Sequence, residues 1–145
     1  MSEIKVPRTN GSIIMVVGVG GAGGNAVNHM WNLGIRGVTF MVCNTDQQAL
    51  DKSPVEKKIR LGAEGLGAGN DPENGRRAAV ETQPEIRQAL EESGTKMLFI
   101  TAGMGGGTGT GASPVIAKLA KEMGLLTVAI VTSPLAVEGK IRYEQ

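Results

Sequence analysis

Two glycine-rich segments, each placed between an apolar run and a helical pattern, constrain the fold of this chain more than any other feature. Gly18–Gly24 reads GVGGAGG and Gly103–Gly111 reads GMGGGTGTG. Glycine lets the backbone adopt φ > 0 and approach another group without a Cβ atom in the way. The first turn of a helix adds unpaired N–H groups and the positive end of the helix dipole. The two segments are therefore predicted to be strand-to-helix loops that bind anions.

Short apolar runs alternate with helical patterns along the rest of the chain. Strands are expected at 12–17, 38–43, 58–61, 97–101 and 125–132. Helices are expected at 25–33, 47–52, 72–92 and 112–123, with Asp71 as an N-cap and a kink or break near Pro84. Continuous apolar strands are typical of a parallel sheet covered on both faces. We predict an α/β fold: a three-layer αβα, Rossmann-like domain with a mostly parallel sheet.

Length and composition limit the class of protein. A chain of 145 residues with a formal net charge of +1 suits one domain and provides no strong field for nucleic acid or membrane surfaces. Residues 1–11 are expected to form a flexible N-terminal tail, and 12–145 the domain. No apolar run approaches the ~20 residues of a membrane-spanning helix, and a single cysteine excludes an internal disulfide. We therefore expect a cytoplasmic protein.

The first glycine segment by itself fits two other interpretations. Gly18, Gly20 and Gly23 satisfy the GxGxxG dinucleotide fingerprint, and Asp46 lies 23 residues beyond Gly23, near the acidic position of that fingerprint. A nicotinamide or flavin oxidoreductase would explain this pattern. A tight strand-to-helix turn without a ligand would explain it too.

The second glycine segment favours a different chemistry. GGGTGTG at 105–111 has no counterpart in the dinucleotide interpretation, and neither segment contains the Gly-Lys-Ser/Thr of a P-loop. Phosphates would therefore be held by backbone amides and by the hydroxyls of Thr108 and Thr110. Together the two segments predict one nucleotide site at the carboxyl edge of the sheet.

Five segments resemble the tubulin/FtsZ family in their order and spacing. They are GVGGAGGNAV at 18–27, NTDQQAL at 44–50, GLGAGNDPENG at 65–75, FITAGMGGGTGTGASPVIA at 99–117 and VEGKIR at 137–142. The resemblance covers about residues 13–142. It implies the GTP-binding domain of a filament-forming cytoskeletal GTPase of bacterial cell division, which binds GTP or GDP, with Mg²⁺ accompanying GTP.

The resemblance also implies partners and a place of action. Subunits of the family associate head to tail into filaments, which meet other division-ring proteins at mid-cell in the cytoplasm. Neither nucleic-acid binding nor direct insertion into a membrane is implied. A non-enzymatic nucleotide-binding or filament-forming relative in the same superfamily remains an alternative.

The family's nucleotide contacts carry over to matching positions of this chain. Contacts with the α- and β-phosphates are implied for Gly21, Ala22, Gly23, Gly24, Asn25, Gly105, Gly106, Gly107, Thr108, Gly109 and Thr110. Sensing of the γ-phosphate is implied for Ala68, Gly69, Asn70 and Asp71. On this assignment Gly107→Asp is predicted to abolish nucleotide binding and to spare the fold.

Four further residues are assigned by the same resemblance. Asn44 and Asp46 would lie near the phosphates and the metal, although Asp46 would equally suit a helix cap. Glu138 would accept hydrogen bonds from the ribose hydroxyls. Arg142 would approach the ribose or base, with a solvated helix residue as the alternative.

The resemblance implies parts that these 145 residues do not include: a sixth strand, a central helix that holds guanine, an acidic loop and a second domain. In the family the acidic loop of one subunit activates water at the nucleotide of the next. No catalytic residue and no direct metal ligand is therefore assigned here, and we expect no GTPase turnover from the chain alone.

Some positions depart from the family or carry no functional assignment. Leu135 and Val137 stand where the family usually has phenylalanine, and Asn70 and Asn74 replace residues that are more often alanine, glycine or valine. These changes concern fine nucleotide contacts rather than the fold. Cys43 is interpreted as a small buried hydrophobe.

Overall fold

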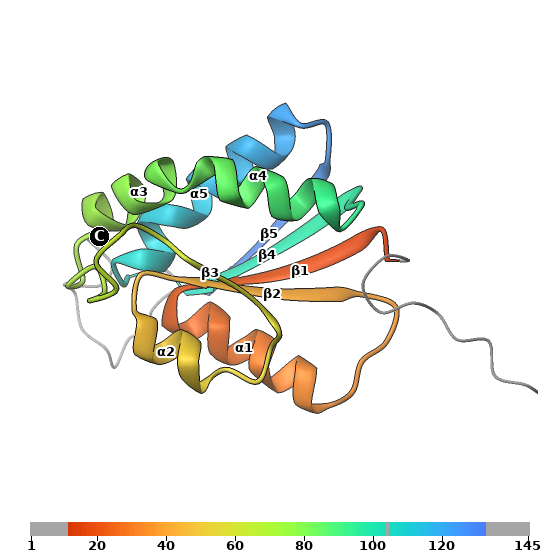
Figure 1. The fold of residues 1–145 in the computed structure, drawn as a ribbon, viewed down its shortest axis with the longest axis horizontal. Coiled ribbons are helices and arrows are strands. Elements are labelled where there is room, and N and C mark those ends of the chain that lie inside the picture. The colour runs from red at the N-terminus through yellow and green to blue at the C-terminus, as the bar shows by residue number, and fades with distance from the viewer. Residues whose placement is uncertain (1–11, 104, 133–145) are drawn as a thin grey trace, which may run out of the picture.

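Five strands and five helices lie along residues 12–103 and 105–132, which are the residues that the computed structural model describes (Figure 1). In chain order they are β1 (Ile14–Val19), α1 (Gly20–Asn32), β2 (Thr39–Asn44), α2 (Gln47–Lys52), β3 (Lys57–Arg60), α3 (Pro72–Glu81), α4 (Gln83–Glu92), β4 (Met97–Gly103), α5 (Thr108–Glu122) and β5 (Leu126–Thr132). The expected tail at 1–11 and the residues Leu135, Val137, Glu138 and Arg142 lie outside the described residues.

The five strands form one sheet in the order β3-β2-β1-β4-β5, and every neighbouring pair is parallel. The chain starts in the centre of the sheet, runs outward to β3, and then crosses back to β4 and β5. The carboxyl ends of β1 and β4 therefore lie side by side, with Val19 opposite Ala102. In open sheets of this kind, ligands bind where the strand order reverses direction.

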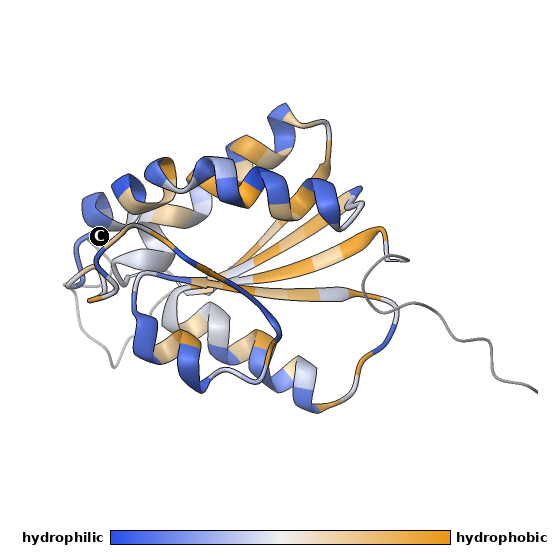
Figure 2. Cartoon of the chain, in the orientation of Figure 1, coloured by the Kyte–Doolittle hydropathy of each residue, from blue (hydrophilic) through white to orange (hydrophobic). Residues whose placement is uncertain are grey.

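Helices cover both faces of the sheet, which confirms the predicted three-layer αβα arrangement. α1 and α2 lie on one face, and α3, α4 and α5 lie on the other (Figure 1). Four strands, β1, β2, β4 and β5, are apolar along most of their length, whereas the outer surfaces of the helices are largely polar (Figure 2). Met15, Leu98 and Ile100 belong to the larger core cluster, and Val27 and Phe40 belong to the smaller one.

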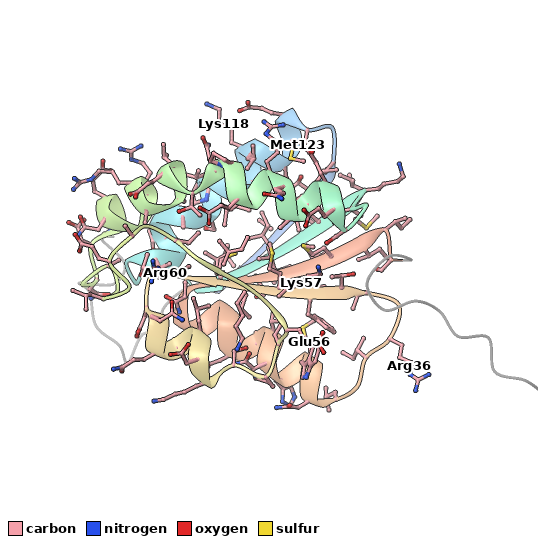
Figure 3. All side chains as sticks on the ribbon, in the orientation of Figure 1. Arg36, Glu56, Lys57, Arg60, Lys118 and Met123 are labelled. Atoms are coloured by element: carbon pink, nitrogen blue, oxygen red, sulfur yellow. The ribbon has the colours of Figure 1, made fainter. Side chains whose placement is uncertain are left out.

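Charged side chains lie on the outside of these layers. Arg36, in the connection between α1 and β2, points away from the body of the molecule, and Lys118 lies on the outer side of α5 (Figure 3). Lys57 and Arg60 belong to the edge strand β3, where charges discourage pairing with another chain. No helix of the described residues is long and apolar enough to cross a membrane.

The opposite edge of the sheet is apolar. Within the part of the chain that the structure describes, β5 pairs only with β4. Leu126, Val128 and Ile130 are exposed, and Val128 lies in register with Phe99, which packs on the α1 face. Among the described residues, the outer edge of β5 is therefore unpaired.

Both glycine segments are more regular than the sequence predicts. β1 continues through Val19 and α1 begins at Gly20, not at residue 25. β4 continues to Gly103 and α5 begins at Thr108, not at residue 112. The glycines allow this because a Cβ atom on Gly23 would lie 2.2 Å from the carbonyl oxygen of Thr101, a distance that only glycine permits. The helices thus start directly against the strand ends.

Several helix boundaries follow the sequence signals closely. Gly34 and Gly124 follow the ends of α1 and α5 with φ of +73° and +82°, as expected for glycine after a helix. The predicted break near Pro84 falls at Thr82, which separates α3 from α4. The Thr82 hydroxyl accepts a hydrogen bond from the N–H of Gly62 at 2.8 Å and so ties the break to the preceding loop.

Candidate functional site

The two glycine segments meet at the carboxyl edge of the sheet. This edge lies at the left of Figure 1, where α1, α3 and α5 begin. A Cβ atom on Gly20 would lie 2.9 Å from the backbone nitrogen of Gly109, so the first turns of α1 and α5 are in direct contact. The predicted convergence of Gly21–Asn25 and Gly105–Thr110 on one edge is therefore confirmed.

The helix N-termini at this edge differ in how their first N–H groups are satisfied. α2 is capped by Asp46, which accepts from the N–H of Gln48 at 2.9 Å, and α3 is capped by Asp71, which accepts from Glu73 at 3.0 Å. α1 and α5 have no side-chain cap and no acidic residue in their first turns. Their unpaired N–H groups and positive dipole ends leave two adjacent positions suited to an anion.

Asp46 therefore serves as a helix cap, the alternative that the sequence left open. Its carboxylate is partly exposed, and its backbone N–H donates to the side-chain oxygen of Asn44 at 3.1 Å. These bonds fix the turn between β2 and α2 beside the first turn of α1.

The candidate glycines divide into open and packed positions. A Cβ atom on Gly21 or Gly24 would meet nothing within 4 Å, and one on Gly106 would meet only the side-chain oxygen of Asn70, at 3.9 Å. Gly23 and Gly109 instead press against backbone atoms of β4. Open glycines offer backbone that a ligand can approach, whereas the packed ones bring the helices onto the strands. Ala22 and Asn25 are also exposed on the first turns of α1.

The threonines of the second segment hold the loop in shape. The Thr110 hydroxyl accepts a hydrogen bond from the N–H of Gly105 at 2.9 Å, which leaves its own proton free to donate. The Thr108 hydroxyl lies 2.6 Å from the hydroxyl of Thr45, and both side chains are buried. Sequence reasoning missed Thr45, although it lies between two assigned residues, Asn44 and Asp46.

The loop at 62–71 reaches the same edge. The N–H of Gly67 donates to the Thr45 carbonyl oxygen at 3.1 Å, and the N–H of Gln47 donates to Gly65 at 3.0 Å. Asn70 has φ of +63°, and the Asn74 side chain donates to the Ala68 carbonyl oxygen at 3.2 Å. The structure thus brings the loop of Ala68, Gly69, Asn70 and Asp71 against the second glycine segment.

This loop packs closely on Gly107, which corrects one expectation. A Cβ atom on Gly107 would lie 2.8 Å from both the Ala68 Cβ and the Asp71 backbone nitrogen. Gly107→Asp is therefore not expected to leave this part of the fold undisturbed, because any side chain there must displace the loop. Gly106, one residue earlier, has the open space that such a substitution needs.

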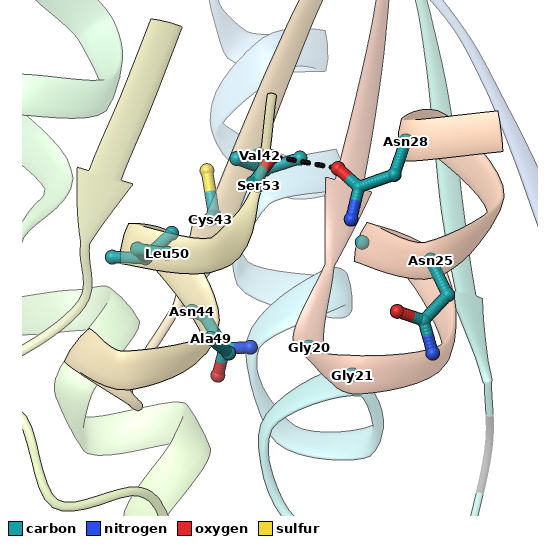
Figure 4. Close-up of a pocket in the computed structure, with 11 residues that line it drawn as sticks. Gly20, Gly21, Asn25, Asn28, Val42, Cys43, Asn44, Ala49, Leu50 and Ser53 are labelled. Carbon is teal, nitrogen blue, oxygen red and sulfur yellow. Dashed lines mark hydrogen bonds between the residues drawn. The ribbon is translucent and has the colours of Figure 1, made fainter. Parts of the chain in front are cut away.

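A pocket extends from the first turn of α1 toward α2 (Figure 4). Gly20, Gly21 and Asn25 line it from α1, and Asn44 lines it from the end of β2. Deeper in, the Ser53 hydroxyl donates to the side-chain oxygen of Asn28 at 2.6 Å and joins the α2 side to α1. The pocket combines these polar groups with apolar residues such as Val42 and Leu50, and it includes the open glycines Gly21 and Gly24.

Cys43 and the ion pair of Glu73 with Arg76 have pKa values that depart from their ordinary range. Burial raises the pKa of the Cys43 thiol to about 12, so the thiol stays protonated at neutral pH. This agrees with its interpretation as a small buried hydrophobe. The hydrogen bond from Arg76 lowers the pKa of Glu73, an exposed pair on the outer side of α3. No group of three or more His, Cys, Asp or Glu within the described residues could hold a metal ion.

The fold and this edge together define a class: a Rossmann-like αβα domain whose parallel sheet presents uncapped helix N-termini for a phosphate-bearing ligand. The comparison with known families is more specific. The description "Tubulin/FtsZ family, GTPase domain" matches residues 13–145, and the chain belongs to this family. Membership confirms the resemblance seen in the sequence and excludes the dinucleotide oxidoreductase.

Individual relatives agree with this assignment. The chain is 56% identical over 131 residues to the cell division protein FtsZ of Porphyromonas gingivalis, covering 88% of this chain and 29% of the relative. It is 52% identical over 147 residues to the FtsZ of Coxiella burnetii, covering 99% of this chain and 38% of the relative. The chain thus spans about a third of the length of these curated relatives.

Solved structures share the fold. An empty FtsZ dimer from M. jannaschii superposes with a TM-score of 0.85 at 46% identity, covering 90% of this chain and 38% of that one. A GTPγS-bound protofilament of CetZ2 from Haloferax volcanii superposes with a TM-score of 0.78 at 30% identity, covering 89% of this chain and 42% of that one. These similarities confirm the predicted fold class.

Proposed function

We propose that this chain is the GTP-binding domain of a filament-forming GTPase of bacterial cell division. The observation that carries the proposal is the pair of uncapped N-termini of α1 and α5, in contact through Gly20 and Gly109 at the carboxyl edge of the sheet. Phosphates supply the negative charge that such N-termini stabilise. Membership of the GTPase-domain family supports guanine nucleotides as the ligands.

The open and packed glycines suggest how the phosphates are held. We infer that the α- and β-phosphates lie over the first turns of α1 at Gly21–Asn25, where Gly21 and Gly24 are open, and over the open backbone of Gly106. The remaining assigned residues of the second segment, Gly105 and Gly107–Thr110, shape that surface through their packing and their hydroxyl bonds. The Ala68–Asp71 loop lies against Gly107 and would complete the site for a γ-phosphate. Glu138 and Arg142 keep their proposed ribose and base contacts.

Magnesium is proposed as the companion of GTP. Mg²⁺ is usually bound by substrate phosphates, several waters and only one or two carboxylates. Asp46 is a partly exposed carboxylate at this edge, and Asn44 lies beside it. The residues present fit such a phosphate-held ion, which would neutralise charge on the nucleotide.

Hydrolysis and assembly are proposed for the whole protein. The relatives are called cell division proteins, and solved relatives include a dimer and a protofilament. We propose head-to-tail filaments in the cytoplasm at mid-cell, contacts with other division-ring proteins, and GTP hydrolysis where successive subunits meet. The chain alone is proposed to lack turnover, because no group that orients the attacking water is assigned among its residues.

A thermal-shift titration with GTP, GDP, ATP and NAD tests nucleotide binding. At a ligand concentration about 100 times Kd, binding raises the free energy of unfolding by about 2.7 kcal/mol, which corresponds to roughly 5–10 °C for a domain of this size. We expect GTP and GDP to produce this shift and NAD to produce none. Comparing the shift with ATP to the shift with GTP measures the preference for guanine over adenine. Stabilisation by NAD alone, or by no nucleotide, would contradict the proposal.

A further inference from the structure

Thr45 links the second glycine segment to the 62–71 loop. Its hydroxyl lies 2.6 Å from that of Thr108, the first residue of α5. Its carbonyl oxygen accepts a hydrogen bond from the N–H of Gly67 in the 62–71 loop at 3.1 Å. The Thr45 side chain is 5% exposed, so solvent does not replace either bond.

A hydrogen bond between hydroxyls is not automatic for buried threonines in this chain. Thr39 and Thr95 are also buried, yet their hydroxyls have no partner within the described residues. The Thr45–Thr108 bond therefore depends on the placement of these two residues. Thr39, the first residue of β2, provides a matched comparison, because β2 ends at Asn44, directly before Thr45.

The direction of this bond decides what Thr108 can offer a ligand. A threonine hydroxyl has one proton to donate and two lone pairs. If Thr108 donates to Thr45, it can present only lone pairs to a phosphate, and these repel an anion. If Thr45 donates, the Thr108 oxygen is satisfied and its proton is free for a phosphate oxygen.

We propose that Thr45 is a positioning residue for nucleotide binding: it donates to Thr108 and thereby directs the Thr108 proton toward the phosphates. The same residue holds the 62–71 loop through its backbone, so it fixes the distance between that loop and α5. This inference rests on the proposed function, because it assumes phosphates at the N-terminus of α5.

Calorimetric titration of GDP into four forms of the chain tests the proposal. Thr45→Val removes the hydroxyl and keeps the shape, and its affinity should fall about tenfold, which corresponds to about 1.4 kcal/mol. Thr45→Ser keeps the hydroxyl and should stay within about twofold of the wild type. Thr39→Val removes a hydroxyl that has no partner and should also stay within about twofold.

A double-mutant cycle separates positioning from a general structural role. If Thr45 acts through Thr108, the double variant T45V/T108V should bind GDP no more weakly than Thr108→Val alone. Additive losses, or wild-type affinity in Thr45→Val, would overturn the inference. Circular dichroism checks the fold of each variant, and Thr45→Ala provides the same comparison if Thr45→Val fails to fold. A wild-type chain that binds no GDP would overturn the proposed function itself, and this inference with it.

Discussion

A Cβ atom on Gly111 would lie only 1.9 Å from the carbonyl oxygen of Pro72, so α3 and α5 meet backbone to backbone at this point. One helical turn away, a Cβ atom on Gly75 would lie 2.3 Å from the carbonyl oxygen of Gly107. These two contacts press the start of α3 onto the start of α5. The 62–71 loop, which leads into α3, is thereby held against the second glycine segment.

Gly111→Ala should destabilise the chain strongly. The added methyl group must push two helix backbones apart, and overpacking of this kind costs about 1–3 kcal/mol. Gly24→Ala is the control, because its Cβ would meet nothing within 4 Å in the middle of α1. That control should be neutral or gain about 0.5–1 kcal/mol of helix stability. Urea unfolding measures both, and equal stability of the two variants would show that α3 and α5 are not in close contact.

Asn70 should tolerate glycine better than alanine. Its φ of +63° lies in the left-handed region, which costs most residues about 1–2 kcal/mol and glycine very little. Both variants lose the side-chain amide of Asn70, so the difference between them isolates the backbone cost. We expect Asn70→Gly to be about 1 kcal/mol more stable than Asn70→Ala in urea unfolding. An alanine variant at least as stable as the glycine variant would contradict this.

The alternation of apolar runs and helical patterns was enough to predict the sheet, its parallel strands and the helices on both faces. Local signals were strong where one residue decides the backbone, as with Asp71 at the start of α3 and Gly34 after α1. The start of α1 was wrong because glycine has low helix propensity, and propensity by itself does not include the packing of Gly23 on β4. Tertiary contact overrides propensity there.

The single cysteine should resist alkylation well above neutral pH. Cys43 is 1% exposed, and burial raises its pKa to about 12. Because the folded state favours the protonated thiol, the contribution of Cys43 to the free energy of unfolding is fully present below the ordinary thiol pKa of about 8.5. That contribution is lost as the pH rises toward 12. At pH 9 we expect slow iodoacetamide labelling of the folded chain and fast labelling in urea, followed by mass spectrometry. Rapid labelling of the folded chain would place Cys43 outside the core.

The candidate site was predictable in outline, because both glycine segments follow adjacent strands of one sheet edge. What the sequence does not indicate is which glycines are open and which are packed, since that depends on neighbours far along the chain. Gly106 and Gly107 are adjacent, yet only Gly107 is pressed against the 62–71 loop. Thr45 was missed for the same reason, because its partner Thr108 is 63 residues away.

The central claim is that phosphates lie over the open backbone of Gly106, and Gly106→Asp tests it most directly. A Cβ atom added at Gly106 would have space, and the Gly106 backbone is not in the left-handed region. The chain should therefore fold with aspartate or asparagine at this position. Asparagine has the same shape without the charge, so comparing the two variants isolates repulsion between a carboxylate and the nucleotide phosphates.

Calorimetric titration of GTP into the wild type, Gly106→Asn and Gly106→Asp is the measurement. We predict that Gly106→Asp binds at least about tenfold more weakly than Gly106→Asn, a difference of about 1.4 kcal/mol, while thermal unfolding of the two variants is similar. Added salt should narrow the gap, because screening weakens charge repulsion. Equal GTP affinity of the aspartate and asparagine variants would show that the phosphates do not lie at this edge and would contradict the account.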